Sequence, residues 1–222
     1  MNCHNLTHIN IEGDAKELIH MNEVFYNCRK LINVDISNLA LSSVKYMNML
    51  FAGCKSLTNV KIGIVNDVID TNNMFADCIS LKEIDLSQLN PTMILNTSYM
   101  FYNCKSLEKI EFPHRSWQIK YMMNMFYNCK HLTDLDLSSF KFSTTEDMTR
   151  LFYGCKRLET LNIPNSPTFT TTADFMFEGC ESLKKLKISK SMSNNSIDML
   201  SMRLNNERII DTDIPMSIVE FI

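Results

Sequence analysis

The chain has 222 residues, 45% of them hydrophobic, and a formal net charge of −3 at pH 7. This charge gives no electrostatic reason to expect a nucleic-acid partner, and no apolar run approaches the ~18 residues of a membrane-spanning helix. Glycine and proline are scarce, with five of each, which argues against low-complexity linkers. These features favour a folded chain with a sizeable apolar interior.

The first residues enter a repeat at once and contain no basic region followed by an apolar stretch, so we see no secretory signal. We expect a cytoplasmic protein if the sequence is complete, and a cell-surface protein if it is a fragment of a longer chain. Residues 1–11 hold only the second half of a repeat unit. The first strand should therefore lack a cap, and this end offers a surface for self-association.

All eight cysteines are spaced 24 to 26 residues apart. They are Cys3, Cys28, Cys54, Cys78, Cys104, Cys129, Cys155 and Cys180. A regular spacing in this range predicts a solenoid, in which each unit buries its apolar face only by stacking on the next.

The residues that follow each cysteine alternate between apolar and polar. Leu107, Ile110 and Phe112 stand three, six and eight residues after Cys104, and every unit is apolar at these three positions. This period of two predicts a strand with one buried face. Stacked units would bring these strands together as a parallel sheet.

The residues before each cysteine follow a different period. A phenylalanine stands three residues before every cysteine except the first, and apolar residues such as Met122, Met125 and Phe126 recur at spacings of three and four. We interpret this pattern as a short helical turn. The predicted fold class is an α/β solenoid: a right-handed, leucine-rich-repeat-like stack of about eight units, with a parallel β-sheet on one face and short helical turns on the other.

We expect residues 1–190 to form the solenoid, with an incomplete first unit, and residues 191–222 to form a degenerate ninth unit or C-terminal cap. In that unit Asn205 or Asn206 takes the cysteine position, and Ser196 could cap a short helix over 197–206. The apolar residues 215–222 should fold back onto the stack.

We interpret the cysteines as buried free thiols that face backbone carbonyls of the turn, in preference to a disulfide framework. No cysteine has a second cysteine or a histidine at zinc-ligand spacing. We also find no glycine-rich phosphate loop, zinc-protease motif or nucleophile elbow. We therefore expect a non-enzymatic protein without a cofactor or metal.

The loops after the predicted strands carry a serine, a polar residue and a large apolar residue in several units, ending at Leu39, Leu89 and Phe140. Trp117, the one tryptophan, stands in a loop that departs from this pattern. It either replaces the apolar loop residue and packs inward, or it is an exposed anchor for a partner.

The polar residues five and seven positions after each cysteine should form two rows on the open face of the sheet. The middle of these rows is acidic, with Glu83, Asp85, Glu111, Asp134 and Asp136, and the C-terminal end is basic, with Lys184, Lys185, Lys187 and Lys190. This face is either a solvated sheet surface or a binding face for a partner with a basic centre. Together with Trp117, the five acidic residues are the candidate partner-binding residues.

The segments 125–132 (MFYNCKHL) and 135–140 (LDLSSF) resemble the BspA-like leucine-rich repeat surface proteins, whose units are about 25 residues long. The likeness covers about residues 1–190. It implies a leucine-rich-repeat solenoid that acts as a protein-interaction scaffold, often in adhesion or host-protein binding. The alternative is a structural subunit of a surface or virion assembly, which docks through its solenoid ends.

Overall fold

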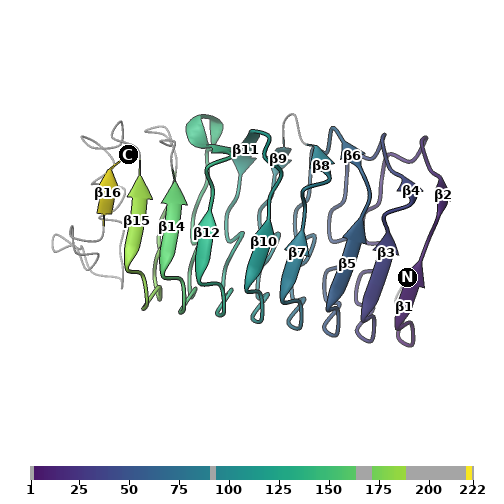
Figure 1. Ribbon diagram of the computed structural model, residues 1–222, viewed down its shortest axis with the longest axis horizontal. Helices are drawn as coiled ribbons and strands as arrows, with labels where there is room; N and C mark the ends of the chain where they lie inside the picture. Colours follow the sequence, from purple (N-terminus) through teal and green to yellow (C-terminus); the bar gives the residue numbers. More distant parts are fainter. Residues whose placement is uncertain (1–2, 91–93, 164–171, 189–218, 222) are drawn as a thin grey trace.

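The computed structural model describes residues 3–90, 94–163, 172–188 and 219–221. The chain winds as a parallel β-solenoid of about seven turns, in which each turn lies beside the next (Figure 1). The number of turns is lower than the predicted eight units, because Cys3 precedes the first strand without a turn segment of its own.

The main sheet is built by the strand that follows each of the eight cysteines, as the period-two pattern predicts, and by a ninth strand, β16, near the C-terminus. Its strands are β1 (His8–Asn10), β3 (Asn33–Ile36), β5 (Asn59–Ile62), β7 (Glu83–Asp85), β10 (Lys109–Glu111), β12 (Asp134–Asp136), β14 (Thr160–Ile163), β15 (Lys185–Ile188) and β16 (Val219–Phe221). The pairs formed are β1–β3–β5, β7–β10 and β12–β14–β15–β16, all parallel. Equivalent residues pair directly, as in Val34 with Val60.

The loops after these strands form a second ladder that sequence patterns did not predict as strands. Its members are β2 (Gly13–Asp14), β4 (Leu39–Ala40), β6 (Val65–Asn66), β8 (Leu89–Asn90), β9 (Ile94–Asn96), β11 (Trp117–Tyr121) and β13 (Phe140–Lys141), followed by the 3₁₀ turn η1 (Phe142–Thr144). The apolar loop residues Leu39, Leu89 and Phe140 belong to these strands. Because their partners come from neighbouring turns, these strands also join one turn to the next.

The prediction of short helical turns before the cysteines is wrong. Among the described residues the one helix is η1. Every second N–H of the turn segment donates to the next turn of the solenoid, at 2.8 to 3.0 Å: Met21 to Tyr46, Glu23 to Asn48, Phe25 to Leu50 and Asn27 to Ala52. Positive φ angles of 58° at Glu23 and 56° at Asn27 interrupt any helix, since helical residues need negative φ.

The phenylalanines and cysteines of the turn segments form two buried columns. Neighbouring rings from Phe25 to Phe177 stack with centroids 5.3 to 5.8 Å apart. Each thiol from Cys54 to Cys180 donates to the carbonyl of the phenylalanine in the preceding turn, with Sγ 3.0 to 3.2 Å from the oxygen. All eight cysteines are free, six of them buried and Cys3 and Cys180 half-buried. The prediction of buried thiols that face turn carbonyls is confirmed for the five from Cys54 to Cys155.

Trp117 is fully buried, so its interpretation as an exposed anchor is wrong and the inward-packing alternative is confirmed. It pairs with Phe140 across β11 and β13, and the two rings stack with centroids 5.2 Å apart. Phe112 meets both rings edge-on. The indole therefore takes the place of the apolar loop residue of other units.

At the C-terminal end, β16 continues the sheet beside β15, with Val219 opposite Leu186. The predicted cysteine equivalent at Asn205 or Asn206 and the predicted helix over 197–206 lie outside the described residues. The boundary near residue 190 stays a prediction. No helix in the described part of the chain has the length and apolar character to cross a membrane.

Candidate functional site: the strand face

The strand face consists of the polar residues five and seven positions after each cysteine. Parallel pairing places them in two rows, as predicted: Asn33 lies beside Asn59 and Asp35 beside Lys61, and the same register continues in β7–β10 and β12–β14–β15. Their apolar neighbours at the intervening positions point inward; Ile84, for example, is buried. The face is thus polar because the strand period of two sends the apolar residues to the core.

Three of the predicted residues line one hollow on this face. Glu83, Asp85 and Glu111 surround a depression of about 530 Å³ together with Lys61 and Lys109. Lys109 forms an ion pair with Glu111, and the Glu111 carboxylate raises the pKa of the lysine. The hollow therefore has mixed charge, with three carboxylates and two ammonium groups.

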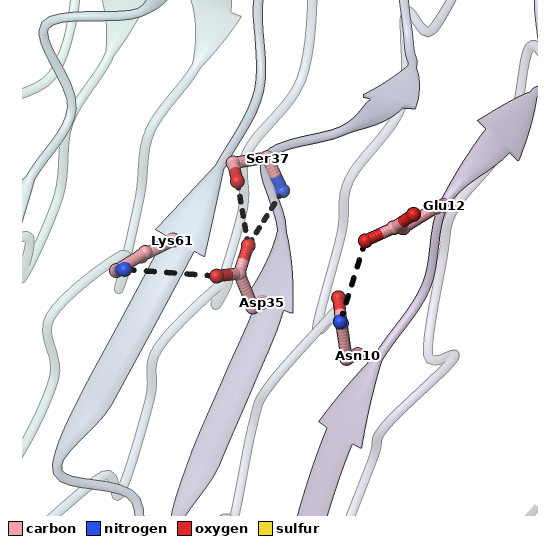
Figure 2. Close-up of polar contacts among 5 residues, drawn as sticks. All are labelled: Asn10, Glu12, Asp35, Ser37 and Lys61. Carbon is pink, nitrogen blue, oxygen red and sulfur yellow. Dashed lines mark hydrogen bonds and ion pairs between the residues drawn. The ribbon is translucent and has the colours of Figure 1, made fainter.

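Aspartates at the ends of the strands have a structural task. The Asp35 carboxylate accepts a hydrogen bond from the Ser37 backbone N–H at 3.0 Å and from the Ser37 hydroxyl at 2.6 Å, and it lies 3.7 Å from the Lys61 ammonium (Figure 2). The hydrogen bond from the Ser37 hydroxyl is the main cause of the lowered pKa of Asp35. Such side-chain bonds to the backbone two residues on stabilise the turn that ends a strand.

The same contact recurs at two of the candidate residues. Asp85 accepts the backbone N–H of Ser87 at 2.7 Å, and Asp136 accepts that of Ser138 at 2.8 Å. The repeated Asp-x-Ser pattern could have indicated this role from the sequence. These carboxylates are therefore partly engaged within the fold, whereas Glu83 and Glu111 form no such turn.

Asp134 and Asp136 also bond to the next turn of the solenoid. The Thr160 hydroxyl donates to Asp134, which lowers the pKa of this carboxyl, and the Asn162 amide donates to Asp136 at 2.9 Å. The acidic residues in the middle of the face therefore form two groups. Those on β7 and β10 surround the hollow, and those on β12 accept hydrogen bonds from β14.

The predicted basic end of the face is partly neutralised. Glu220, on β16, lies 2.9 Å from the Lys185 ammonium and 3.9 Å from that of Lys187. Lys184 pairs with Glu159 at 2.9 Å, and Lys190 lies outside the described residues. The sequence predicted that residues 215–222 fold back onto the stack, but not that Glu220 would lie beside these lysines.

The described residues contain no group of three or more histidine, cysteine, aspartate or glutamate side chains placed to hold a metal ion. Sequence reasoning did miss a second concave region, formed by tyrosines of the turn segments. Tyr102, Tyr127 and Tyr153 stack with centroids 4.8 and 4.7 Å apart. The signal was present, since all three stand two residues before a cysteine.

Comparisons with known proteins agree with this architecture. Residues 72–201, more than half of the chain, match the family described as BspA type leucine rich repeat region, in six copies. Residues 19–121 match the family described as Mycoplasma protein of unknown function, DUF285. No curated protein matches.

Among solved structures, a leucine-rich repeat protein from Bacteroides ovatus is similar over 100% of this chain and 79% of its own, with 19% identity and a TM-score of 0.33. On the strength of the family match and of the register of its repeats, the chain belongs to the BspA type leucine-rich repeat family.

Proposed function

We propose that the chain is a protein-interaction scaffold whose strand face binds a protein partner with a basic centre. The observation that carries the proposal is the hollow of about 530 Å³ between β5, β7 and β10, where exposed carboxylates gather on a sheet face. Membership of a repeat family supports it, because solenoids present extended surfaces of this kind to partners. Adhesion to host proteins is one form that such binding takes.

Glu83 and Glu111 are the residues with which to test the proposal. Both lie at the hollow, and neither holds a strand-ending turn as Asp85 does. Reversing the charge of Asp85 or Asp136 would also remove the hydrogen bond that holds the turn. A loss of binding in such a variant could then result from a change in local structure. The strand-face variant is therefore Glu83→Lys/Glu111→Lys.

The matched control is Glu17→Lys/Asp174→Lys, which makes the same change in net charge at exposed positions away from the strand face. Each of the three proteins is immobilised and used to capture partners from host extract, and each identified partner is then measured directly. We expect binding to the wild-type and control proteins, loss in the strand-face variant, and weaker wild-type binding at high salt. Equal binding by all three proteins would contradict the proposal.

A second candidate, docking of two copies through the β1 end, is supported by apolar exposure there. Five of the eight large hydrophobic side chains that are exposed in the described chain lie between residues 11 and 32: Ile11, Leu18, Ile19, Val24 and Ile32. Sedimentation should then show concentration-dependent association that Ile11→Lys/Ile19→Lys abolishes. A monomer at all concentrations would exclude this candidate.

A further inference from the structure

A second hollow, which we call the turn hollow, is built by the turn segments and contains none of the strand-face residues. Its volume is about 380 Å³, at the small end of the range for ligand sites. It is lined by Tyr99, Tyr102, Asn124, Tyr127, Arg150 and Tyr153, with Phe175 and Glu178 at its C-terminal end. Two columns of equivalent residues form its walls.

One column is the tyrosine ladder two residues before the cysteines. Tyr102 and Tyr127 stack at 4.8 Å, and Tyr127 and Tyr153 stack at 4.7 Å with an interplanar angle of 4°. The ladder shows that flat rings at equivalent positions of successive turns pack face to face. The distance between neighbouring ring centroids in this ladder is 4.7 to 4.8 Å.

The other column stands five residues before the cysteines and contains Tyr99, Asn124, Arg150 and Phe175. The Arg150 guanidinium lies 5.0 Å from the centroid of the Phe175 ring, so neighbours in this column touch along the stack. Asn124 has a short side chain between two long ones. Tyr99 and Arg150 stand two turns apart, and two steps of the neighbouring tyrosine ladder amount to about 9.5 Å. At the spacing of this ladder, one flat group has room between them.

Asn124 supplies unpaired polar atoms at this gap. Its exposed fraction is 5%, yet no hydrogen bond joins its side-chain amide to another residue in the described part of the chain. Its backbone is fully used, because its N–H donates to Thr149 at 2.9 Å and its carbonyl accepts from Tyr127 at 3.1 Å. Asn124 lines the hollow, and its amide is not among the buried polar atoms that lack a partner. The amide therefore remains accessible to a ligand that both accepts and donates hydrogen bonds.

We propose that the turn hollow binds one planar heterocycle that carries a hydrogen-bond donor and acceptor side by side on its edge, as a nucleobase does. The ring stacks on the Arg150 guanidinium and meets Tyr99 on its other side, while its edge pairs with the Asn124 amide. Single bases are held in this way by aromatic rings, guanidinium planes and polar edges. Tyr99 is tilted by 58° relative to Tyr102, so a ring that lies parallel to the tyrosine ladder meets Tyr99 at an angle and not face to face.

Other flat or polar groups fit less well. A phenol or indole ring has a single polar group and leaves half of the Asn124 amide unpaired. A peptide group satisfies the amide but does not fill a gap between a ring and a guanidinium. The net charge of −3 disfavours a polynucleotide, so the ligand is a nucleoside-like small molecule.

Saturation-transfer difference NMR on the full chain tests this site with adenosine, cytidine, guanosine and uridine, and with ribose, phenol and indole as comparison probes. The variant is Asn124→Gly, because glycine accepts the φ of 56° at this position without strain. The matched control is Asn73→Gly, at the equivalent position two turns earlier, where φ is 55°. Arg150→Ala removes the stacking wall.

We expect transfer to the base protons of at least one nucleoside, with affinity reduced at least tenfold in Asn124→Gly and Arg150→Ala and unchanged in Asn73→Gly. Absence of transfer to any base, or equal transfer in Asn124→Gly, would overturn the proposal. Equal or stronger binding of phenol or indole would also overturn it, and would make the hollow an anchor point for an aromatic side chain of a protein partner.

Discussion

At the scale of single residues, the solenoid repeats one arrangement around each cysteine. The Phe75 carbonyl accepts two hydrogen bonds, from the Cys78 N–H of its own turn at 3.1 Å and from the Cys104 thiol of the next turn at 3.1 Å. A thiol fits this position because it is small and apolar and still donates weakly. The cysteine thus fills the core and joins neighbouring turns at the same time.

Replacing Cys104 with alanine should remove both contributions. The side chain is fully buried, so the change leaves a small cavity and one carbonyl with a single donor. We expect a loss of about 1–2 kcal/mol in the free energy of unfolding, measured by urea denaturation. A Cys3→Ala variant is the control, because Cys3 is half-buried and its thiol donates to no phenylalanine carbonyl among the residues that the structure describes. A Cys104→Ala protein as stable as wild type would show that the thiol is not part of the core.

The thiols also predict how stability depends on pH. Burial, and secondarily the neighbouring Cys28, raises the pKa of the Cys54 thiol from its usual 9.0 to about 12. Between these values the unfolded chain loses a proton that the folded chain keeps, so the folded state is destabilised as the pH rises. The expected slope is about 1.4 kcal/mol per pH unit for each such thiol.

Urea unfolding at several pH values from 8 to 11 measures this slope. Tyrosines and lysines titrate in the same range, so the informative quantity is the difference in slope between the wild type and Cys54→Ala. The free energy of unfolding of Cys54→Ala should fall less steeply with pH, by the contribution of one thiol, about 1.4 kcal/mol per pH unit. Identical slopes in the two proteins would mean that Cys54 keeps an ordinary pKa in the folded chain.

Single residues differ in how well their environment follows from the sequence. Leu107 and Cys104 are fully buried, as their period predicts, because position in a repeat determines which face a side chain occupies. Trp117 left two interpretations open, since its loop lacks the pattern of its neighbours. The roles of Asp85 and Asp136 at strand ends were not predicted, although the Asp-x-Ser pattern carried the signal.

At the scale of elements, the strands were predicted and the turn segments were not. The spacing of Met21, Val24 and Phe25 fits a helical face, but Val24 is 42% exposed while the other two are buried. The residue directly before each cysteine argues against a helix. Asn27 and its equivalents at this position are asparagine, aspartate or glycine. These residues tolerate positive φ and end a helix.

The turn segments also contain positions that sequence rules do not reveal. Tyr99, Arg150 and Phe175 have φ of 60°, 52° and 59°, although bulky residues disfavour this region by roughly 1–2 kcal/mol. The hydrogen bonds from turn to turn impose this backbone, as in the Tyr99 N–H to the Met123 carbonyl at 2.9 Å. Tertiary contacts of this kind override local preference.

The position before each cysteine offers a test of the turn geometry. Gly154 has φ of 70°, and a Cβ there would lie 2.4 Å from Asn128 Oδ1. Gly154→Ala should therefore lower the free energy of unfolding by roughly 1–3 kcal/mol, from strain and steric overlap. Thermal unfolding followed by circular dichroism measures the loss.

The double variant Gly154→Ala/Asn128→Gly separates the two causes. It removes the overlapping side chain and keeps the strained backbone, so it should recover part of the stability lost in Gly154→Ala. If Gly154→Ala costs nothing, the turn does not have the positive φ seen here.

At the scale of the whole molecule, stability is spread along the stack. Each turn packs its phenylalanine and leucine between those of its two neighbours, so no central core dominates. The same regularity sets equivalent side chains in rows. The strand face comes from the two positions five and seven residues after each cysteine, and the turn hollow from the two positions two and five residues before it. The proposed ligand site uses a position whose residue varies between units, with Tyr99, Asn124 and Arg150 in successive turns.

The measurement that tests this architecture most directly is alkylation of the native chain with iodoacetamide at neutral pH, with each cysteine followed by mass spectrometry. Six thiols are fully buried and two, Cys3 and Cys180, are half-buried. The solenoid predicts labelling at these two end positions and protection of the six between them until the chain is unfolded. Rapid labelling of Cys78, Cys104 or Cys129 in the native protein, or a disulfide between any two cysteines, would contradict it.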